Sequence, residues 1–131
     1  MKKFLFIITL ISSMKLFAEL PPYVYEELQK KAPESLLMKV DDVAIKPSVF
    51  AYTRVNVVAH VLAVSRSNSR LKKNDKITII YTTFTSRPKG WVGPSPVPIL
   101  EKDKTYRAFL TKSEEGNIYV PAAKGQSFIG K

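Results

Sequence analysis

The feature that most constrains this chain is the segment 51–65, in which hydrophobic side chains recur with a period of two. Successive side chains of a β-strand point to opposite faces. We expect one face to carry Val55, Val57, Ala59, Val61 and Ala63, and the other to carry Asn56, Val58, His60, Leu62 and Val64. Because both faces are partly apolar over such a length, the segment is typical of a long, coiled strand shared between two parts of a barrel.

Four other segments have strand features. Residues 34–45 alternate with a period of two as far as Asp41-Asp42, and Val43 and Ile45 then continue the alternation one residue out of step. A β-bulge at the aspartate pair would produce this shift. The remaining predicted strands are residues 76–84, 104–110 and 118–120, with β-branched and aromatic side chains.

A short helix is predicted before these strands, over residues 22–32. Proline is favoured in the first turn of a helix, and Val24 and Leu28 are four residues apart, so they share one face. Pro33 disfavours helical backbone at the residue before it and ends the segment.

The order of these elements predicts the fold class. No helix separates consecutive strands, so we expect antiparallel pairing, because parallel neighbours need long crossovers. Five such strands in 131 residues most simply form a mainly β single domain, a small five-stranded antiparallel Greek-key (OB-like) barrel with a short N-terminal helix. The sequence has no cysteine, which excludes disulfides and thiolate metal sites.

The N-terminus has the organisation of a secretory signal peptide. A positive start at Met1–Lys3 precedes an apolar run at residues 4–11 and a more polar stretch that ends in Ala18. The run is shorter than the about 20 apolar residues that span a bilayer, so no transmembrane segment is expected. We predict a signal peptide over 1–18, cleaved after Ala18, a mature domain over 19–131, and a periplasmic or secreted location. A buried N-terminal strand or helix is the alternative.

The charge of the mature chain is a weak guide to its partners. The sequence has 21 basic and 11 acidic residues, and removal of residues 1–18 leaves 18 basic and 11 acidic ones. A moderate positive excess suits a protein that meets anionic cell envelope or another exported protein. Nucleic acid is not an expected partner, since exported proteins seldom meet it.

Three segments together resemble a known family. They are Phe50–Ser65, Asp75–Thr82 with the pattern D-x-I-x-x-I-Y-T, and Leu100–Leu110 with Tyr106. In this order they resemble the netrin-like (NTR) domain, whose nearest relatives here are the tissue inhibitors of metalloproteinases, and the chain looks like a bacterial member. The resemblance covers roughly residues 50–120 and implies an OB-type barrel.

For function, the resemblance implies a protein-interaction module or an inhibitor of metalloproteases. The metalloproteinase inhibitors begin their mature chain with a cysteine that chelates the protease zinc, and disulfides staple their fold. This chain would begin at Glu19 and has no cysteine. That mechanism is therefore not carried over, because a shared fold does not by itself imply a shared function.

Residues suited to catalysis are few. His60 is the only histidine and lies within the long predicted strand, where a structural role is the default and a Ser-His-Asp arrangement is the alternative. A zinc site needs three or four protein ligands, and adjacent carboxylates point in different directions. We therefore expect no enzyme activity, no metal and no cofactor.

The segment 86–98 is the first candidate binding site. Its prolines and glycines exclude an interior strand or helix and predict a long, stiff loop. Trp91, between Gly90 and Gly93, suits an exposed anchor, because tryptophan is enriched in interface hot spots. Folding back to cap the barrel end is the alternative.

Basic residues are the second candidate. If two loops lie at one end of the barrel, they form a cationic rim; an ordinary surface with lysines at strand edges is the alternative. The residues concerned are Arg66, Arg70, Lys72, Lys73 and Lys76 in one loop and Arg87 and Lys89 in the next. OB barrels also bind oligonucleotides or sugars by aromatic stacking, for which the candidates are Tyr52, Tyr81, Phe84 and Trp91.

These observations favour an exported, non-enzymatic binding module that contacts another exported protein. The alternative is an OB-type domain that binds a component of the cell envelope or a polyanion, such as an oligosaccharide or a nucleic acid.

Overall fold

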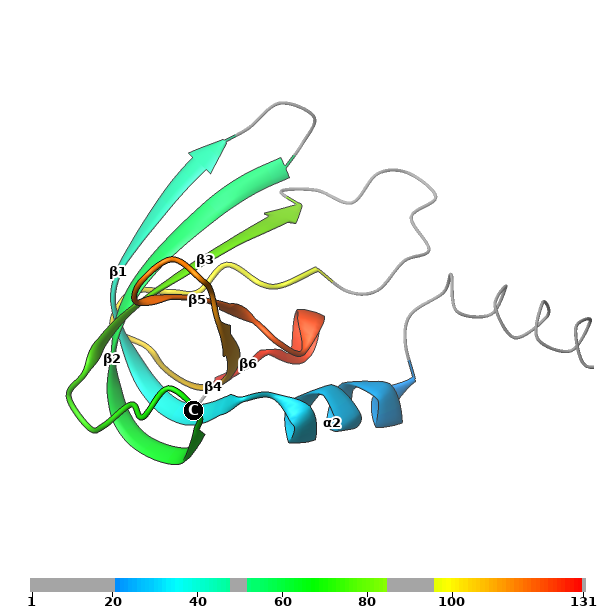
Figure 1. Cartoon of the computed structure of the whole chain (residues 1–131). Helices are drawn as coiled ribbons and strands as arrows, with labels where there is room; N and C mark the ends of the chain where they lie inside the picture. Colours follow the sequence, from blue (N-terminus) through cyan, green and yellow to red (C-terminus); the bar gives the residue numbers. More distant parts are fainter. Residues whose placement is uncertain (1–20, 48–51, 85–95, 131) are drawn as a thin grey trace, which may run out of the picture.

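The computed structural model describes residues 21–47, 52–84 and 96–130 (Figure 1). It begins with helix α2 (Pro22–Lys31), followed by strands β1 (Glu34–Pro47), β2 (Tyr52–Ser67), β3 (Lys76–Phe84), β4 (Thr105–Lys112) and β5 (Ile118–Pro121). A 3-10 turn, η2 (Lys124–Gln126), and a short strand, β6 (Phe128–Gly130), end the described chain. The expected mainly β fold with a short N-terminal helix is confirmed. The predicted signal peptide lies outside the described residues.

Five strands close into a barrel. The order along the sheet is β1-β2-β3-β5-β4, and β1 also pairs with β4, so the first and last strands of this series meet (Figure 1). This closing seam joins Glu34 to Leu110 at one end and Lys39 to Thr105 at the other. β6 pairs with the part of β4 that β5 does not cover. The predicted small barrel is therefore the observed fold.

One pair of strands differs from the expected antiparallel pattern. β3 and β5 run parallel, with Thr78 opposite Ile118 and Ile79 opposite Tyr119. The requirement for antiparallel pairing holds for strands joined by short connections. β3 and β5 are separated by the whole of β4, so their relative direction is not constrained in this way.

Three irregularities interrupt the pairing of β1 with β2. Val40 is opposite Ala59 and Asp42 is opposite Val58, so Asp41 is the extra residue and the predicted bulge is confirmed. Two further shifts leave Leu62 and Ser65 without partners in β1. Ala63, between them, is exposed and does not share the buried face of Val55, Val57, Ala59 and Val61 that the sequence predicted for it.

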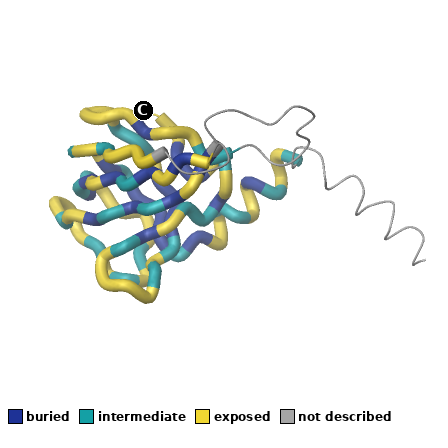
Figure 2. The backbone as a smooth tube through the Cα atoms, turned by 90° about the horizontal axis from the view of Figure 1, so that it is seen from above, coloured by how far each residue is buried: buried dark blue, intermediate teal, exposed yellow. Residues whose placement is uncertain are grey.

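The barrel interior holds the main hydrophobic core. Buried and exposed positions alternate along the strands (Figure 2), and the inward positions form one cluster. Its central members are Leu36, Met38, Val40, Val55, Val57, Ala59, Val61, Ile77, Ile79, Leu110 and Tyr119. Burial of this apolar surface supplies most of the stability of a fold without disulfides.

A smaller cluster lies outside the barrel, beneath α2. Ala108 and Leu110 of β4 face the interior core, whereas Phe109 between them packs with Ala32 and Ala123. Leu28 of α2 packs against the same cluster, as its helical spacing predicted. The helix therefore covers the outer face of β4.

Candidate functional site

The structure divides the predicted binding residues into separate groups. Trp91, Arg87 and Lys89 lie outside the described residues, so the anchor loop and its half of the cationic rim stay predictions. Arg66 and Arg70 are described but have different surroundings. Lys72 and Lys73 are exposed on the connection between β2 and β3.

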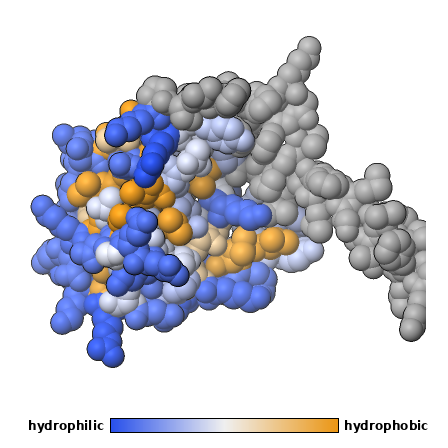
Figure 3. Space-filling view, turned by 45° about the horizontal axis from the view of Figure 1, so that its top comes forward, coloured by the Kyte–Doolittle hydropathy of each residue, from blue (hydrophilic) through white to orange (hydrophobic). Residues whose placement is uncertain are grey.

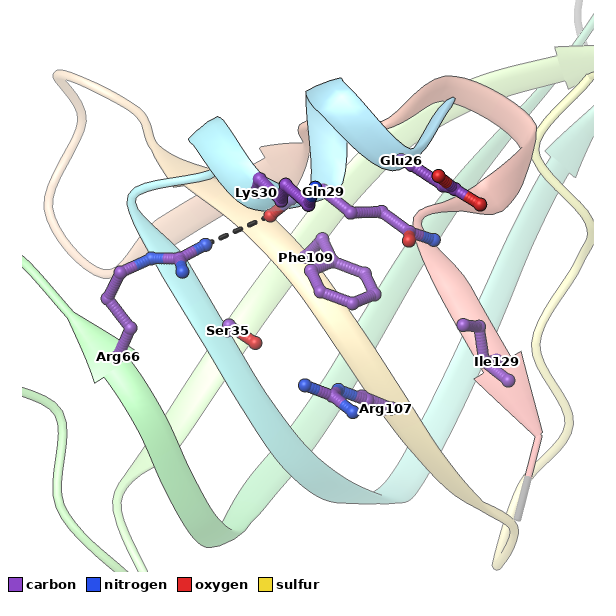
Figure 4. A pocket seen from close by; sticks show the side chains of 8 residues that line it. All are labelled: Glu26, Gln29, Lys30, Ser35, Arg66, Arg107, Phe109 and Ile129. Carbon is purple, nitrogen blue, oxygen red and sulfur yellow. Dashed lines mark hydrogen bonds between the residues drawn. The ribbon is translucent and has the colours of Figure 1, made fainter. Parts of the chain in front are cut away.

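Arg66 caps a helix. It belongs to β2, which extends to Ser67, and not to the loop that the sequence suggested. Its Nε donates to the Ala32 carbonyl at 2.8 Å and its Nη2 donates to the Gln29 carbonyl at 2.9 Å, the contact dashed in Figure 4. The last carbonyls of a helix lack intrahelical partners and carry partial negative charge. The guanidinium of Arg66 is thus held by the protein itself.

Replacing Arg66 by alanine is expected to lower the free energy of unfolding by about 1 kcal/mol, because two carbonyls lose a charged donor. Urea denaturation of the purified variant measures the change. Arg70→Ala removes the same charge without uncapping a helix and is the control. Equal losses in the two variants would contradict the capping role.

Arg70 takes part in a basic pocket at the end of the barrel. The connection between β2 and β3 meets the end of β4 and the start of β5 there, around a cavity of about 440 Å³. We call it the basic pocket; it is lined in part by Arg70, Lys76, Lys112, Ser69, Asn117 and Tyr119. Sequence reasoning grouped Arg70 with Lys76. It missed Lys112, the last residue of β4, and Asn117, in the turn before β5, which only the barrel topology brings close.

The backbone of the β2–β3 connection is held in an unusual conformation. Arg70 and Asn74 have positive φ angles, 64° and 76°, a region that non-glycine residues seldom adopt. The Leu71 amide donates to Ser67 Oγ at 2.9 Å, and the Asn74 amide donates to the Val61 carbonyl at 2.7 Å. Such strain persists only where surrounding contacts hold it, so this connection presents Arg70 in a defined direction.

In the described residues, the cations of the basic pocket form no ion pair with a carboxylate. In the described residues the ion pairs are Glu27 with Lys31 and Asp41 with His60. Asp75 also lines the pocket, but its Oδ2 accepts a hydrogen bond from the Lys72 amide at 2.8 Å. Three positive side chains therefore meet one carboxylate in the pocket, and this excess of positive charge favours an anion there.

A buried carboxyl group supports this end of the barrel. Glu34 is only 1% exposed. Its Oε1 accepts hydrogen bonds from the Ser67 hydroxyl, from the Ser69 hydroxyl at 2.7 Å and from the Ser69 amide at 3.3 Å. Ser69 Oγ is also 2.7 Å from the hydroxyl of Tyr119, which lines the basic pocket. The network ties β1, the β2–β3 connection and β5 together.

The alternation of β1 could have predicted that Glu34 is buried. Glu34 has the same parity as Leu36 and Met38, whose side chains are buried, so a strand beginning at residue 34 turns Glu34 inward. Its serine partners lie in a stretch that the sequence predicted to be a solvated loop. Their role was therefore not predicted.

A groove under α2 is another concave site (Figure 4). It has a volume of about 280 Å³ and lies between the helix, β4 and β6. The guanidinium carbon of Arg107 lies 5.4 Å from the centre of the Phe109 ring, within the range of a cation–π interaction. Arg66, at the edge of the groove, caps the helix. Since both arginines are already engaged, the groove suits an anion less well than the basic pocket does.

His60 has a partner that the sequence did not predict. Its Nδ1 lies 2.8 Å from Oδ1 of Asp41, the bulged residue of β1. No serine hydroxyl is hydrogen-bonded to His60 in the part of the chain that the structure describes. In the same residues, no group of three histidine or acidic side chains is placed to hold a metal ion.

The aromatic residues proposed for stacking are separated by the fold. Tyr81 faces the interior and is 7% exposed, so it is not a stacking platform as the sequence suggested. Tyr52 is 42% exposed on the outer face of β2. The Phe84 side chain and Trp91 lie outside the described part. On the face in Figure 3, hydrophilic side chains surround small apolar patches.

Comparisons with known proteins do not place the chain in a family. No family model, no curated protein and no solved structure matches it. None of the described helices is long and apolar enough to cross a membrane. The fold and the basic pocket are therefore the basis for the functional argument.

Proposed function

We propose that this protein is an exported, non-catalytic binding domain that recognises an anionic partner through the basic pocket. The observation that carries the proposal is the convergence of Arg70, Lys76 and Lys112 on one cavity, in which Asp75 is the one lining carboxylate and positive charge is in excess. A cavity of about 440 Å³ lies within the usual range for small-ligand sites, roughly 300–1,000 Å³. Hydroxyl and amide groups beside the cations would orient the bound group.

Export supports the choice of partner. The signal-like residues 1–18 predict a periplasmic or secreted protein, which meets anionic envelope polymers and other exported proteins. We also propose a distant kinship with netrin-like domains. The three segments that resemble this family and the small barrel fold support this kinship. A protein related to netrin-like domains would bind another exported protein, through an acidic patch on that partner. Protease inhibition rests on that resemblance alone.

Loss of the three pocket cations is expected to weaken binding to an anionic polymer about tenfold at low salt. Exposed ion pairs contribute about 0.5 kcal/mol each, and three of them contribute about 1.5 kcal/mol, which corresponds to roughly a factor of ten in affinity. The measurement is the salt concentration that elutes the protein from a sulfated and from a carboxylated resin, for wild type and for the Arg70→Ala, Lys76→Ala, Lys112→Ala variant.

A matched control removes three exposed charges elsewhere. Lys46, Lys102 and Lys104 are exposed and lie toward the ends of β1 and β4 that are remote from the basic pocket. Equal losses of retention in the two triple variants would show a general charge effect and contradict the proposal. Affinity capture from the exported fraction distinguishes the two kinds of partner. An exported protein that binds the wild type but not the triple pocket variant would show that the partner is a protein and not an envelope polymer.

A further inference from the structure

Part of one edge of β1 is not paired with any other described strand. On this edge β1 pairs with β4 as far as Lys39, and Val40 still exchanges backbone hydrogen bonds with Asp103 and Lys104. Beyond Val40, β1 pairs only with β2, and its end extends past β4 toward the top of Figure 1. Such an open edge can pair with a strand of another molecule.

Two residues direct their backbone hydrogen-bonding groups toward the open edge. Val61 of β2 exchanges both of its backbone hydrogen bonds with the connection that leads into β3. Because this direction alternates along an antiparallel strand, the backbone groups of Val57 and Val55 also face β3 and not β1. Their partners in β1 are Val43 and Ile45. The amide and carbonyl groups of Val43 and Ile45 therefore point away from β2, toward the open edge.

The open edge, residues 42–46, is bounded on both sides. The bulge at Asp41 precedes it, and Pro47, which has no amide hydrogen, follows it. Lysine and proline on an edge often protect it from association, and Lys46 is the last residue of this one. The charge at the other end of the edge therefore decides whether a second edge is repelled or attracted.

The order of side chains along the open edge is complementary to itself. In an antiparallel pair of such edges centred on Ala44, Val43 of one copy lies opposite Ile45 of the other. Asp42 of one copy then lies opposite Lys46 of the other. Each of these contacts occurs twice, as the two-fold symmetry of a homodimer requires. Opposite charges that face each other across two strands stabilise their pairing.

The same side chains lack partners within the single chain. Ile45 is 50% exposed, although Val55 beside it is fully buried. Asp42 and Lys46 are exposed and form no ion pair with another described residue. Lys46 lies across from Arg54, which is also a cation. An aspartate on the free side of Lys46 would supply the opposite charge, and a second copy provides it.

We infer that two copies of this protein associate through the open edge of β1 and form a reversible dimer with two-fold symmetry. Val43 and Ile45 exchange backbone hydrogen bonds across the interface, and two pairs of Asp42 with Lys46 flank them. The pairing is short, so the interface belongs to the small, weak class. This end of β1 is remote from the basic pocket, and the inference does not depend on the proposed function.

Reversal of the edge charges tests the inference. Asp42→Lys places two lysines opposite each other twice per dimer, and Lys46→Asp does the same with aspartates. Each variant is expected to dimerise at least about tenfold more weakly than the wild type. An equimolar mixture of the two variants should dimerise as the wild type does, because every lysine again meets an aspartate. Sedimentation equilibrium up to about 1 mM protein, where weak dimers are populated, measures the association.

Two matched controls and a second measurement complete the test. Glu114→Lys and Lys30→Asp reverse exposed charges away from the edge and should leave the association unchanged. In the wild type, hydrogen exchange of the Val43 and Ile45 amides, followed by NMR, should slow as the protein concentration rises. If the charge variants do not fold, this exchange measurement alone decides.

Three results would overturn the inference. A wild type that stays monomeric up to the highest concentration shows that the edge is protected. A dimer that the charge variants form as readily as the wild type uses another surface. Exchange of the Val43 and Ile45 amides that does not depend on concentration excludes pairing at this edge. Each of these results leaves the anion-binding function of the basic pocket standing.

Discussion

Replacing Glu34 by alanine is expected to lower the free energy of unfolding by about 3 kcal/mol. The side chain is 1% exposed, and its loss removes the acceptor for the hydroxyls of Ser67 and Ser69 and for the Ser69 amide. Hydrogen bonds to charged groups contribute about 1.5–3 kcal/mol each, and buried donors left without partners add a penalty. Urea denaturation followed by circular dichroism gives the difference.

An exposed carboxylate is the natural control for this prediction. Glu27 forms a 3.9 Å ion pair with Lys31 on the surface of α2, and pairs of this kind contribute about 0.5 kcal/mol or less. Glu27→Ala should therefore be close to wild type. If Glu34→Ala is as stable as Glu27→Ala, the network does not hold this end of the barrel together.

The stability of the protein is expected to fall between about pH 10 and pH 12 because of Tyr81. Burial raises the pKa of Tyr81 to about 12, whereas a tyrosine in an unfolded chain has a pKa of about 10. Below pH 10 both states keep the proton and the contribution of Tyr81 is complete. Between the two values only the unfolded chain releases it, so unfolding becomes easier by on the order of 2 kcal/mol.

Tyr81→Phe isolates this effect from the other groups that titrate at high pH. The Tyr81 hydroxyl donates to the Pro98 carbonyl at 2.7 Å and accepts from the Leu100 amide at 3.3 Å, so the variant should be about 1 kcal/mol less stable at pH 8. Toward pH 12 the difference should shrink and change sign. Urea unfolding curves at several pH values measure it, and a constant difference across this range would contradict the assignment.

The strands were predictable from the sequence because one face of each meets a dry interior. Alternation grouped Val55 and Val57 on one face, which is buried, and the change of phase at Asp41 located a bulge that the pairing of β1 with β2 contains. The irregularity at Leu62 could not be predicted, because apolar residues occupy both faces of the strand there. The parallel pairing of β3 with β5 depends on closure of the barrel, which no local pattern encodes.

The candidate site was predicted only in part, because its residues come from distant segments. The cluster of basic residues in the sequence predicted a cationic site at the β2–β3 connection. Arg70 and Lys76 of this cluster line a common cavity. Charge alone did not distinguish them from Arg66, whose position beside the end of α2 gives it a capping role. Lys112 joins the pocket through the order of strands, which a linear pattern does not reveal.

The seam between β1 and β4 has a consequence for how the chain matures. Residues 34–39 find their second partner only in residues 105–110, so the barrel stays open until these residues have emerged from the ribosome. Contacts so remote in sequence form slowly, and a partly made chain leaves one edge of β1 unpaired and prone to association. A polypeptide whose barrel closes late stays unfolded for longer, and a translocation channel requires an unfolded chain.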